Sequence, residues 1–343
     1  MTIGITGGAG FIGCNVAARY LNKGNKVVIF DNFSRKGTRN NLAWLRKIKK
    51  GRLEVIKGDI RTDKTALKRF AAGCDLVYHL AAQVAVTTSV VDPVEDFDIN
   101  ALGTFNVLEA VRSSPKKPPV VYASTNKVYG KMSGVKLAEK KTRHIYRNLP
   151  RGVNEAEPLD FYSPYGCSKG CGDQYVRDYA RIYGLKTVVF RQSCIYGERQ
   201  FGVEDQGWVA HFIISAVLGR PMTIYGDGKQ VRDLLFVDDL VDAYEKAVGR
   251  IGRTAGQIYN IGGGPANTLS LLELLDQLNG LLGRKITCPF AAPRPGDQLI
   301  YVSDIGKARR DLGWTPGITV PAGIKRLHAW VAANKKELES PLR

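Results

Sequence analysis

The sequence has little of what metal sites and disulfide frameworks require. It contains only four histidines, which lie far apart, and no two cysteines have C-x-x-C spacing. The six cysteines are scattered along the chain: Cys14, Cys74, Cys167, Cys171, Cys194 and Cys288. Thiols without paired spacing are typical of a reducing compartment. We therefore expect a cytoplasmic protein with free thiols and no metal site.

Long apolar runs are also absent from the sequence. No stretch of about 18 apolar residues occurs, so we expect no membrane-spanning helix. The first residues enter a predicted strand directly, without the basic segment, apolar stretch and cleavage site of a signal peptide. We expect neither membrane insertion nor export.

Acidic residues are scarce relative to basic ones, 32 against 50, which gives a net charge of +18. Such a charge attracts polyanions, but no known nucleic-acid-binding motif accompanies it. The basic residues gather in short stretches at 46–52, 116–117 and 140–147. We interpret them as a solvated surface that also suits a negatively charged nucleotide-diphosphate substrate, and we expect no nucleic-acid partner.

Apolar runs rich in β-branched residues alternate with helical patterns along most of the chain. This alternation predicts an α/β fold, a doubly wound parallel sheet with helices on both faces. The predicted strands are 2–6, 26–31, 53–57, 76–80, 120–123, 187–190 and 257–261. The segment 131–160 is charged and lacks periodicity, which predicts a long functional or mobile loop.

The less regular pattern after residue 190 predicts a smaller C-terminal lobe that binds substrate. We expect a nucleotide-binding domain at 1–190, with 234–262 returning to it. The lobe would then comprise 191–233 and 263–343.

A glycine-rich turn follows the first predicted strand. Gly7, Gly10 and Gly13 lie where that strand passes into a helix. Glycine allows a tight turn and lets backbone N–H groups approach a pyrophosphate, which the positive helix end stabilises. Asp31 ends the second strand and can accept hydrogen bonds from ribose hydroxyls. Because Asp31 would repel a 2′-phosphate, the sequence favours NAD over NADP, and we interpret Arg35 nearby as part of an exposed turn.

Later strand ends carry further candidate cofactor contacts. Asp59 could accept a hydrogen bond from the adenine amino group, and the small residues Ala81 and Ala82 would let a dinucleotide lie against the backbone. The residues expected to bind the cofactor on these grounds are Gly7, Gly10, Phe11, Ile12, Gly13, Asp31, Asn32, Ser34, Arg35, Asp59, Ile60, Leu80, Ala81, Ala82 and Gln83.

Tyr165 and Lys169 lie four residues apart, after a plausible helix start at 163–164. At this spacing they share one helix face, and an ammonium beside a phenol lowers the pKa of the phenol. Tyr165 could then take the proton of a sugar hydroxyl while a hydride leaves the carbon for the cofactor. The alternative is a surface tyrosine and lysine, which the neighbouring dinucleotide pattern disfavours.

Together these motifs resemble the extended short-chain dehydrogenase/reductases that epimerise or dehydrate nucleotide sugars on a Rossmann fold. The resemblance covers nearly the whole chain. It implies that Thr125 hydrogen-bonds the reacting oxygen, that Tyr165 and Lys169 also contact the cofactor, and that Asn100 helps to hold the cofactor and central helix. It further implies a homodimer formed through helices near 101–112 and 165–183.

Two downstream stretches, 225–239 and 294–297, resemble the nucleotide-binding segments of this family. The resemblance implies that Arg232 and Arg294 bind phosphate and that Asp297 binds the nucleotide ribose. The expected substrate-binding residues are Thr125, Asn126, Gln206, Arg232, Arg294 and Asp297.

Local motifs distinguish between reactions within the family. Sugar 4,6-dehydratases carry Thr-Asp-Glu where this chain has Thr-Asn-Lys at 125–127, and an amide with an ammonium cannot replace that acid–base pair. Galactose-type 4-epimerases usually carry asparagine at the position of Cys194 and within 205–209. We interpret Cys194 and Cys167 as packed small residues, not as acid–base thiols.

The stretches 124–130, 163–170 and 199–208 resemble the CDP-paratose (CDP-tyvelose) 2-epimerases. That resemblance implies a CDP-hexose 2-epimerase that oxidises carbon 2 transiently with tightly bound NAD. Its substrate would be CDP-paratose or the fully hydroxylated CDP-glucose. A UDP-sugar or UDP-uronate 4-epimerase and a non-catalytic dinucleotide sensor are the alternatives.

Overall fold

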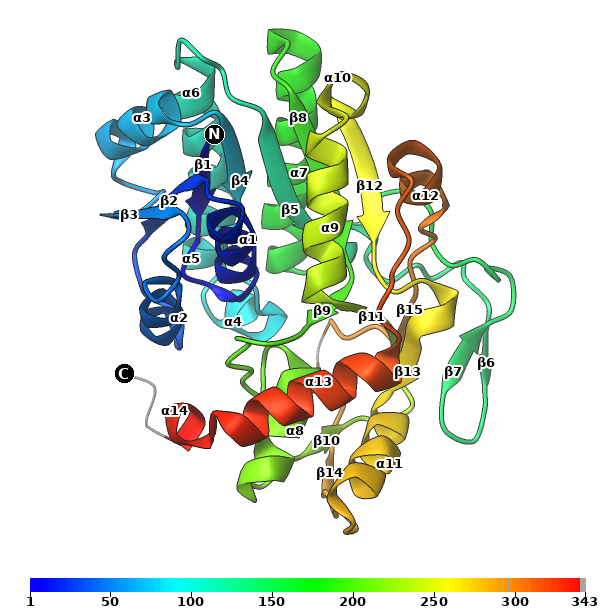
Figure 1. Ribbon diagram of the computed structural model, residues 1–343. Helices are drawn as coiled ribbons and strands as arrows, with labels where there is room; N and C mark the ends of the chain where they lie inside the picture. Colours follow the sequence, from blue (N-terminus) through cyan, green and yellow to red (C-terminus); the bar gives the residue numbers. More distant parts are fainter. Residues whose placement is uncertain (295, 340–343) are drawn as a thin grey trace.

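A seven-stranded parallel sheet forms the centre of the computed structural model, which describes residues 1–294 and 296–339 (Figure 1). The strand order is β12-β8-β5-β4-β1-β2-β3, and every pairing is parallel. The strands are β1 (Thr2–Thr6), β2 (Lys26–Asp31), β3 (Arg52–Lys57), β4 (Leu76–His79), β5 (Val120–Thr125), β8 (Thr187–Gln192) and β12 (Gln257–Ile261). The order reverses direction between β1 and β4, so a crevice is expected at the carboxyl ends of these strands.

Helices cover both faces of this sheet and bury its continuous apolar strands. On one face Ile29 packs in a core with α1 (Phe11–Asn22) and α9 (Val237–Val248). On the other face Val28 and Phe30 pack in a second core. The helices of that second face are α3 (Lys64–Gly73), α6 (Gly103–Arg112) and α7 (Pro164–Tyr183). Alternate side chains of β2 therefore point to opposite faces, as the period of a strand requires.

A smaller sheet lies in the C-terminal part of the chain. There β11 (Val231–Phe236) pairs in parallel with β9 (Cys194–Tyr196) and β15 (Ile300–Tyr301), and antiparallel with β13 (Thr268–Ser270). The helices α8 (Trp208–Leu218), α11 (Leu271–Leu282) and α13 (Val320–Ala333) lie beside it (Figure 1). Of the segment 234–262, β12 lies in the large sheet, whereas residues 234–236, at the end of β11, lie in the small one.

Short elements complete the described chain. They are α2 (Thr38–Leu45), α4 (Val86–Val91), α5 (Pro93–Phe97), a π-helix at Asp98–Leu102, 3₁₀ helices at Asn126–Tyr129 and Pro265–Asn267, β10 (Ile224–Tyr225), α10 (Ile251–Thr254), β14 (Phe290–Ala291), α12 (Gly306–Leu312) and α14 (Lys335–Glu339). Among the residues described, no helix is both long and apolar enough to cross a membrane. In the same ranges no cluster of three potential ligands could hold a metal ion.

The segment 131–160 contains an antiparallel hairpin of β6 (Leu137–Glu139) and β7 (His144–Tyr146). His144 Nε2 lies 3.1 Å from Asp227 Oδ2, and Tyr146 Oη donates to the Ile300 carbonyl at 3.2 Å. These partners are more than 80 positions away in the sequence. The segment expected to be an irregular loop is therefore ordered by contacts with the C-terminal part of the chain.

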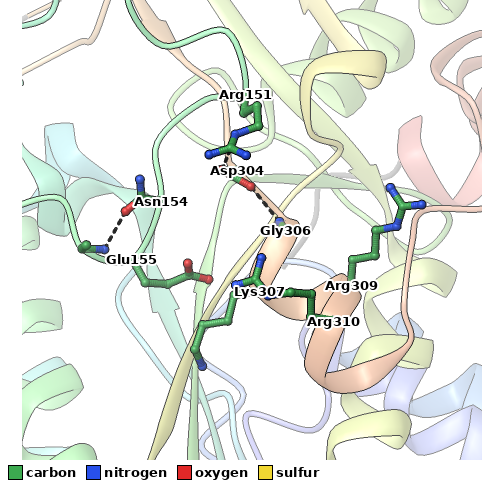
Figure 2. Close-up of a pocket in the computed structure, with 9 residues that line it drawn as sticks. Arg151, Asn154, Glu155, Asp304, Gly306, Lys307, Arg309 and Arg310 are labelled. Carbon is green, nitrogen blue, oxygen red and sulfur yellow. Dashed lines mark hydrogen bonds and ion pairs between the residues drawn. The ribbon is translucent and has the colours of Figure 1, made fainter.

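A cavity of about 780 Å³ lies beside β12, the edge strand of the large sheet (Figure 2). Lys307 Nζ donates to the Ile258 carbonyl at 3.0 Å, and Glu155 Oε1 accepts from the Asn260 N–H at 2.7 Å. These side chains satisfy backbone groups along the free edge of the sheet, which protects that edge from pairing with another strand. None of the residues lining this cavity belongs to the expected active site.

Candidate active site

The glycine turn between β1 and α1 is shaped to receive a pyrophosphate. Gly7 has a φ of +68°, and a Cβ there would lie 2.7 Å from the Ala81 nitrogen. A Cβ on Gly13 would lie 2.2 Å from the Gly7 carbonyl oxygen. Gly10 caps α1 without a side-chain acceptor, so the first N–H groups of the helix, including those of Phe11 and Ile12, remain available to an anion.

Asp31 lies at the carboxyl end of β2 and is 7% exposed. Its Oδ2 accepts from the Ala9 N–H at 3.0 Å, and its Oδ1 accepts from the Phe33 N–H at 2.8 Å. Burial raises the pKa of Asp31, and these two backbone hydrogen bonds act in the opposite direction. Each oxygen keeps a lone pair with which it could accept a hydrogen bond from a ribose hydroxyl.

Asp59, the expected adenine acceptor, lies in a network of hydrogen bonds after β3. Its carboxylate accepts from the Arg61 side chain at 2.8 and 3.0 Å and from Asn32 Nδ2 at 3.0 Å. The Arg61 guanidinium lowers the pKa of Asp59 to about 2. Asn32 Oδ1 also accepts from the Ser34 N–H at 3.0 Å. The Asn32 side chain therefore connects the expected cofactor residues that follow β2 with Asp59, which follows β3.

The segment after β4 runs alongside the glycine turn. The Thr6 hydroxyl accepts from the Leu80 and Ala81 N–H groups at 3.3 Å. Asn100 Oδ1 accepts from the Gln83 N–H at 3.0 Å. Asn100 lies in the π-helix, and such one-turn bulges are frequent at functional sites. The remaining expected cofactor residues are Ala82, which lies between these contacts, and Ile60, whose carbonyl accepts from Asn106 Nδ2 at 3.0 Å.

Tyr165, Lys169 and Thr125 converge where α7 crosses the end of β5. Tyr165 and Lys169 lie in α7, with 8% and 3% of their surface exposed. Pro164 at the first helical position and the Ser163 hydroxyl, which accepts from the Gly166 N–H at 3.0 Å, begin the helix. The structure therefore brings the three expected catalytic residues together.

The phenol of Tyr165 is not activated by Lys169 in the way expected from their spacing. Burial raises the pKa of Tyr165 to about 12, while a hydrogen bond with Thr125 and the Arg35 charge lower it. Lys169 Nζ donates to the Ala123 carbonyl at 2.6 Å and lies 4.3 Å from the Tyr122 ring centroid. The expectation of a lowered phenol pKa was thus wrong for this structure, because desolvation exceeds the favourable contributions.

Lys169 itself is strongly affected by its surroundings. Burial lowers its pKa to about 7, and the charges of Asp173 and Asp96 raise it. Asp173 already forms two 2.9 Å hydrogen bonds with the Arg191 guanidinium. Because this pKa lies near neutral pH, the charges around Lys169 determine how much of it is protonated.

Besides Thr125, three of the expected substrate residues lie in two groups near the end of β5. Asn126 Nδ2 donates to Gln298 Oε1 at 3.2 Å. Arg232 donates to Asp297 Oδ1 at 2.6 Å, and Lys127 Nζ lies 3.9 Å from the same oxygen. Burial and the Arg232 charge lower the pKa of Lys127 to about 8. The carboxylate of Asp297 therefore lies between two cations.

The other two expected substrate residues lie in separate contacts. Arg294 packs over the Tyr225 ring at 3.9 Å and donates to the Glu204 carbonyl at 3.0 Å. Gln206 Oε1 accepts from Arg35, which links the turn after β2 to the segment before α8. The Arg294 carbonyl accepts from the Asp297 N–H at 3.3 Å. Among the residues described, neither the Arg294 side chain nor the Gln206 side chain forms an ion pair or hydrogen bond with Asp297, Arg232 or Lys127.

Sequence reasoning missed Gln298, Lys127 and Asp96. Gln298 is 7% exposed and Asp96 is fully buried, yet neither belongs to a motif that stands out in the sequence. Lys127 was weighed only as the residue that replaces a catalytic acid. Lys127 lies in the 3₁₀ helix Asn126–Tyr129, just after β5, and no pattern in the sequence marks its burial.

The thiols of Cys194 and Cys167 both have raised pKa values. Burial raises the pKa of Cys194 to about 12 and also raises that of Cys167. All six cysteines are free. Cys194 is partly buried, which agrees with its interpretation as a packed small residue, whereas Cys167 is exposed, so that interpretation was wrong for Cys167.

Comparisons with known proteins extend over nearly the whole chain. Residues 3–262 match the family described as "NAD dependent epimerase/dehydratase family". The chain is 43% identical to the CDP-paratose 2-epimerase of Salmonella typhi over 339 residues, which cover 97% of this chain and 100% of that protein.

Two solved structures are similar to this protein over nearly its whole length. A dTDP-glucose 4,6-dehydratase double mutant from Streptomyces venezuelae, with NAD and DAU bound, has a TM-score of 0.86 and 31% identity, with both chains covered to 100%. The UDP-glucose 4-epimerase of Thermotoga maritima with UDP-glucose has a TM-score of 0.83 and 30% identity, covering 98% of this chain and 100% of that one.

Proposed function

The chain belongs to the NAD dependent epimerase/dehydratase family, and on that premise we propose that it inverts carbon 2 of a CDP-hexose. The substrates would be CDP-paratose, giving CDP-tyvelose, and CDP-glucose, giving CDP-mannose. The observation that carries this proposal is the 43% identity with a CDP-paratose 2-epimerase over 97% of this chain and 100% of that protein.

The expectations for the fold, the cofactor and the class of enzyme are confirmed. The protein has the doubly wound fold of the extended short-chain dehydrogenase/reductases, uses NAD, and is a nucleotide-sugar epimerase. The non-catalytic sensor is therefore set aside. The glycine turn and the accepting carboxylate of Asp31 fit NAD on physical grounds.

The residues after Thr125 support an epimerase over a dehydratase. Elimination of water needs an acid and a base beside the sugar, whereas positions 126 and 127 carry an amide and an ammonium. The Asn126 amide is bound to Gln298, and Lys127 faces Asp297. Transient oxidation needs only one proton acceptor, which Tyr165 can be.

In the proposed mechanism Tyr165 Oη takes the proton of the sugar 2-hydroxyl. NAD, when bound, supplies the hydride acceptor and returns the hydride to carbon 2. Thr125 donates a hydrogen bond that stabilises the Tyr165 phenolate, while Lys169, which donates to the Ala123 carbonyl, would contact the cofactor. After the 2-keto sugar has turned over in the site, Tyr165 returns the proton to the new hydroxyl on the opposite face.

We propose that the nucleotide diphosphate is held by the cations at the cleft. Arg232 and Arg294 would bind phosphate, Asp297 the nucleotide ribose, and Asn126 and Gln206 other parts of the substrate. The pairing of Asp297 with Arg232 supports this arrangement, because a diphosphate can replace the carboxylate as partner of the guanidinium.

We also propose a cytoplasmic homodimer and the division into the two lobes stated above. Exposed apolar side chains on the outer helices support the dimer, and they include Val94, Phe97, Phe105, Tyr175 and Ile182. The Phe105 and Tyr175 rings meet edge to face at 5.8 Å, which joins α6 and α7 into one apolar surface. Light scattering tests this part, and the mass of a single protomer would contradict it.

The second candidate is a 4-epimerase acting on a UDP-sugar or a UDP-uronate. The likeness to the Thermotoga maritima UDP-glucose 4-epimerase favours it, because that structure is similar along the whole chain. Cys194 and the segment 205–209 are the sequence features that speak against it.

One incubation distinguishes these candidates. The purified protein is mixed with CDP-paratose, CDP-glucose, UDP-glucose or UDP-glucuronate without added cofactor, and each sugar is followed by proton NMR. We expect tyvelose- and mannose-configured products from the CDP-sugars alone. Inversion at carbon 4 of a UDP-sugar would replace the proposal with the second candidate.

A further inference from the structure

A buried carboxylate, that of Asp96, lies against the catalytic helix α7 and has no part in the mechanism described above. Asp96 lies in α5, whose start is capped by the Asp92 side chain accepting from the Glu95 N–H at 2.9 Å. Asp96 is 0% exposed. Its Oδ2 accepts from the Ser168 hydroxyl at 2.5 Å, and its Oδ1 accepts from Asn100 Nδ2 at 3.1 Å.

Asp96 differs from the other buried carboxylate near Lys169 because it has no cationic partner in contact. Asp173 forms a bidentate pair with the Arg191 guanidinium. Asp96 forms no ion pair among the residues described, and both of its partners are neutral donors. Burying a carboxylate without a cationic partner costs free energy, so we expect the negative charge of Asp96 to have a function.

The hydrogen bonds of Asp96 determine how Asn100 is oriented. A carboxylate only accepts, so Asn100 must turn its Nδ2 toward Asp96. Its Oδ1 is then free to accept from the Gln83 N–H in the segment beside the glycine turn. Ser168, the other donor to Asp96, directly precedes Lys169 in α7. One carboxylate thus joins α5, the π-helix and α7.

We propose that Asp96 is a positioning residue of the active site, whose hydrogen bonds fix Asn100 and α7 and whose unpaired negative charge stabilises the Lys169 ammonium. This inference rests on the proposed function only where activity is the readout.

The charges around Lys169 agree with this assignment. The groups facing it are Asp173 on its own helix, Asp96 on α5, the Tyr122 ring and the Ala123 carbonyl on β5, and His79 on β4. Burial keeps His79 uncharged by lowering its pKa to about 3. Asp173 raises the pKa of Lys169 more than Asp96 does, but Asp173 also pairs with Arg191, whereas Asp96 has no cationic partner in contact.

The test replaces the charge and keeps the shape. In Asp96→Asn the new amide can still accept from Asn100 and can donate to the Ser168 oxygen, so the hydrogen-bonded arrangement is conserved. Glu95→Gln, one residue away on the exposed side of α5, is the matched control. Ser168→Ala removes a hydrogen bond but leaves the charge. Thermal unfolding of the three variants confirms that each is folded.

The direct readout is the titration of Lys169 by NMR of the NAD-loaded protein labelled with carbon-13 lysine, with its signal assigned by Lys169→Arg. We expect Asp96→Asn to lower the midpoint by about one pH unit. Glu95→Gln and Ser168→Ala should leave the midpoint in place. An unchanged midpoint in Asp96→Asn would overturn the inference.

Activity provides the second readout. Asp96 raises the pKa of both Lys169 and Tyr165, so its removal should move both limbs of the kcat profile to lower pH. A uniform loss of kcat without displacement would show a structural role only, and would also overturn the inference. If the wild-type protein turns over no CDP-sugar, the proposed function fails, but the lysine titration still decides the role of Asp96.

Discussion

Asn126 Nδ2 donates a 3.2 Å hydrogen bond to Gln298 Oε1, although the two residues lie 172 positions apart in the chain. Gln298 in turn donates to the Gly130 carbonyl. The side chain that follows Thr125 is therefore held between the end of β5 and the C-terminal part of the chain. An elimination would need a carboxylic acid at this position, so the amide pair separates this site from that of a dehydratase.

Removal of the Tyr165 hydroxyl tests the proton acceptor. We expect Tyr165→Phe to lower kcat by about 10²- to 10⁴-fold, the usual contribution of a positioned acid–base group, with little change in NAD content. Tyr162→Phe is the matched control, because that phenol is 48% exposed and three residues away. Steady-state kinetics with CDP-glucose measure both variants. Activity retained by Tyr165→Phe would exclude this residue as the base.

A methyl group at the glycine turn should abolish cofactor retention. In Gly13→Ala the new Cβ would lie 2.2 Å from the Gly7 carbonyl oxygen, so the turn that faces the pyrophosphate must shift. In Gly73→Ala, at the end of α3, nothing lies within 4 Å of the new atom. We expect NAD released on denaturation to be absent from the first protein and present in the second. Equal NAD content would contradict the placement of the cofactor.

Lys127 should make nucleotide-diphosphate binding dependent on pH. Its pKa is lowered to about 8, so the side chain is charged below that pH and neutral above it. We expect the affinity for CDP, measured by calorimetry, to fall between about pH 7 and pH 9. Lys127→Gln should bind CDP about ten-fold more weakly at pH 7 and lose most of this dependence.

The exposed Lys131 provides the comparison for that experiment. Its ammonium lies 4.7 Å from the Tyr162 ring, and Lys131→Gln should bind CDP like the wild type. An unchanged pH profile in Lys127→Gln would show that another group titrates.

The buried pair of Asp173 and Arg191 should matter for stability. The residues are 0% and 2% exposed, so removing one charge leaves the other buried without a partner. We expect Asp173→Asn to lower the free energy of unfolding by about 3–5 kcal/mol. Arg326→Ala breaks the exposed contact with Asp238 and should cost less than about 1 kcal/mol. Urea denaturation compares them, and similar losses would contradict this ranking.

Much of the fold could be predicted because local patterns coincide with the observed elements. The glycine turn after 2–6 and the proline at the start of α7 place the cofactor turn and Tyr165 correctly, since both depend on neighbouring residues. The hairpin in 131–160 could not be predicted, because its partners Asp227 and Ile300 come from distant segments. Asp96 was missed for the same reason.

The raised pKa of Tyr165 shows a second limit of prediction from sequence. Four-residue spacing indicates that Lys169 shares a helix face with the phenol, but it contains no information about burial. The tertiary structure determines that desolvation exceeds the stabilising charges and that Lys169 donates to Ala123.

The most direct test of carbon 2 oxidation is turnover of CDP-glucose in deuterium oxide, with the product examined by NMR. The account predicts a mannose-configured product that retains protium at carbon 2, because the hydrogen removed from this carbon returns to it without exchange. Deuterium at carbon 2 would show proton abstraction in place of hydride transfer and would contradict the central claim.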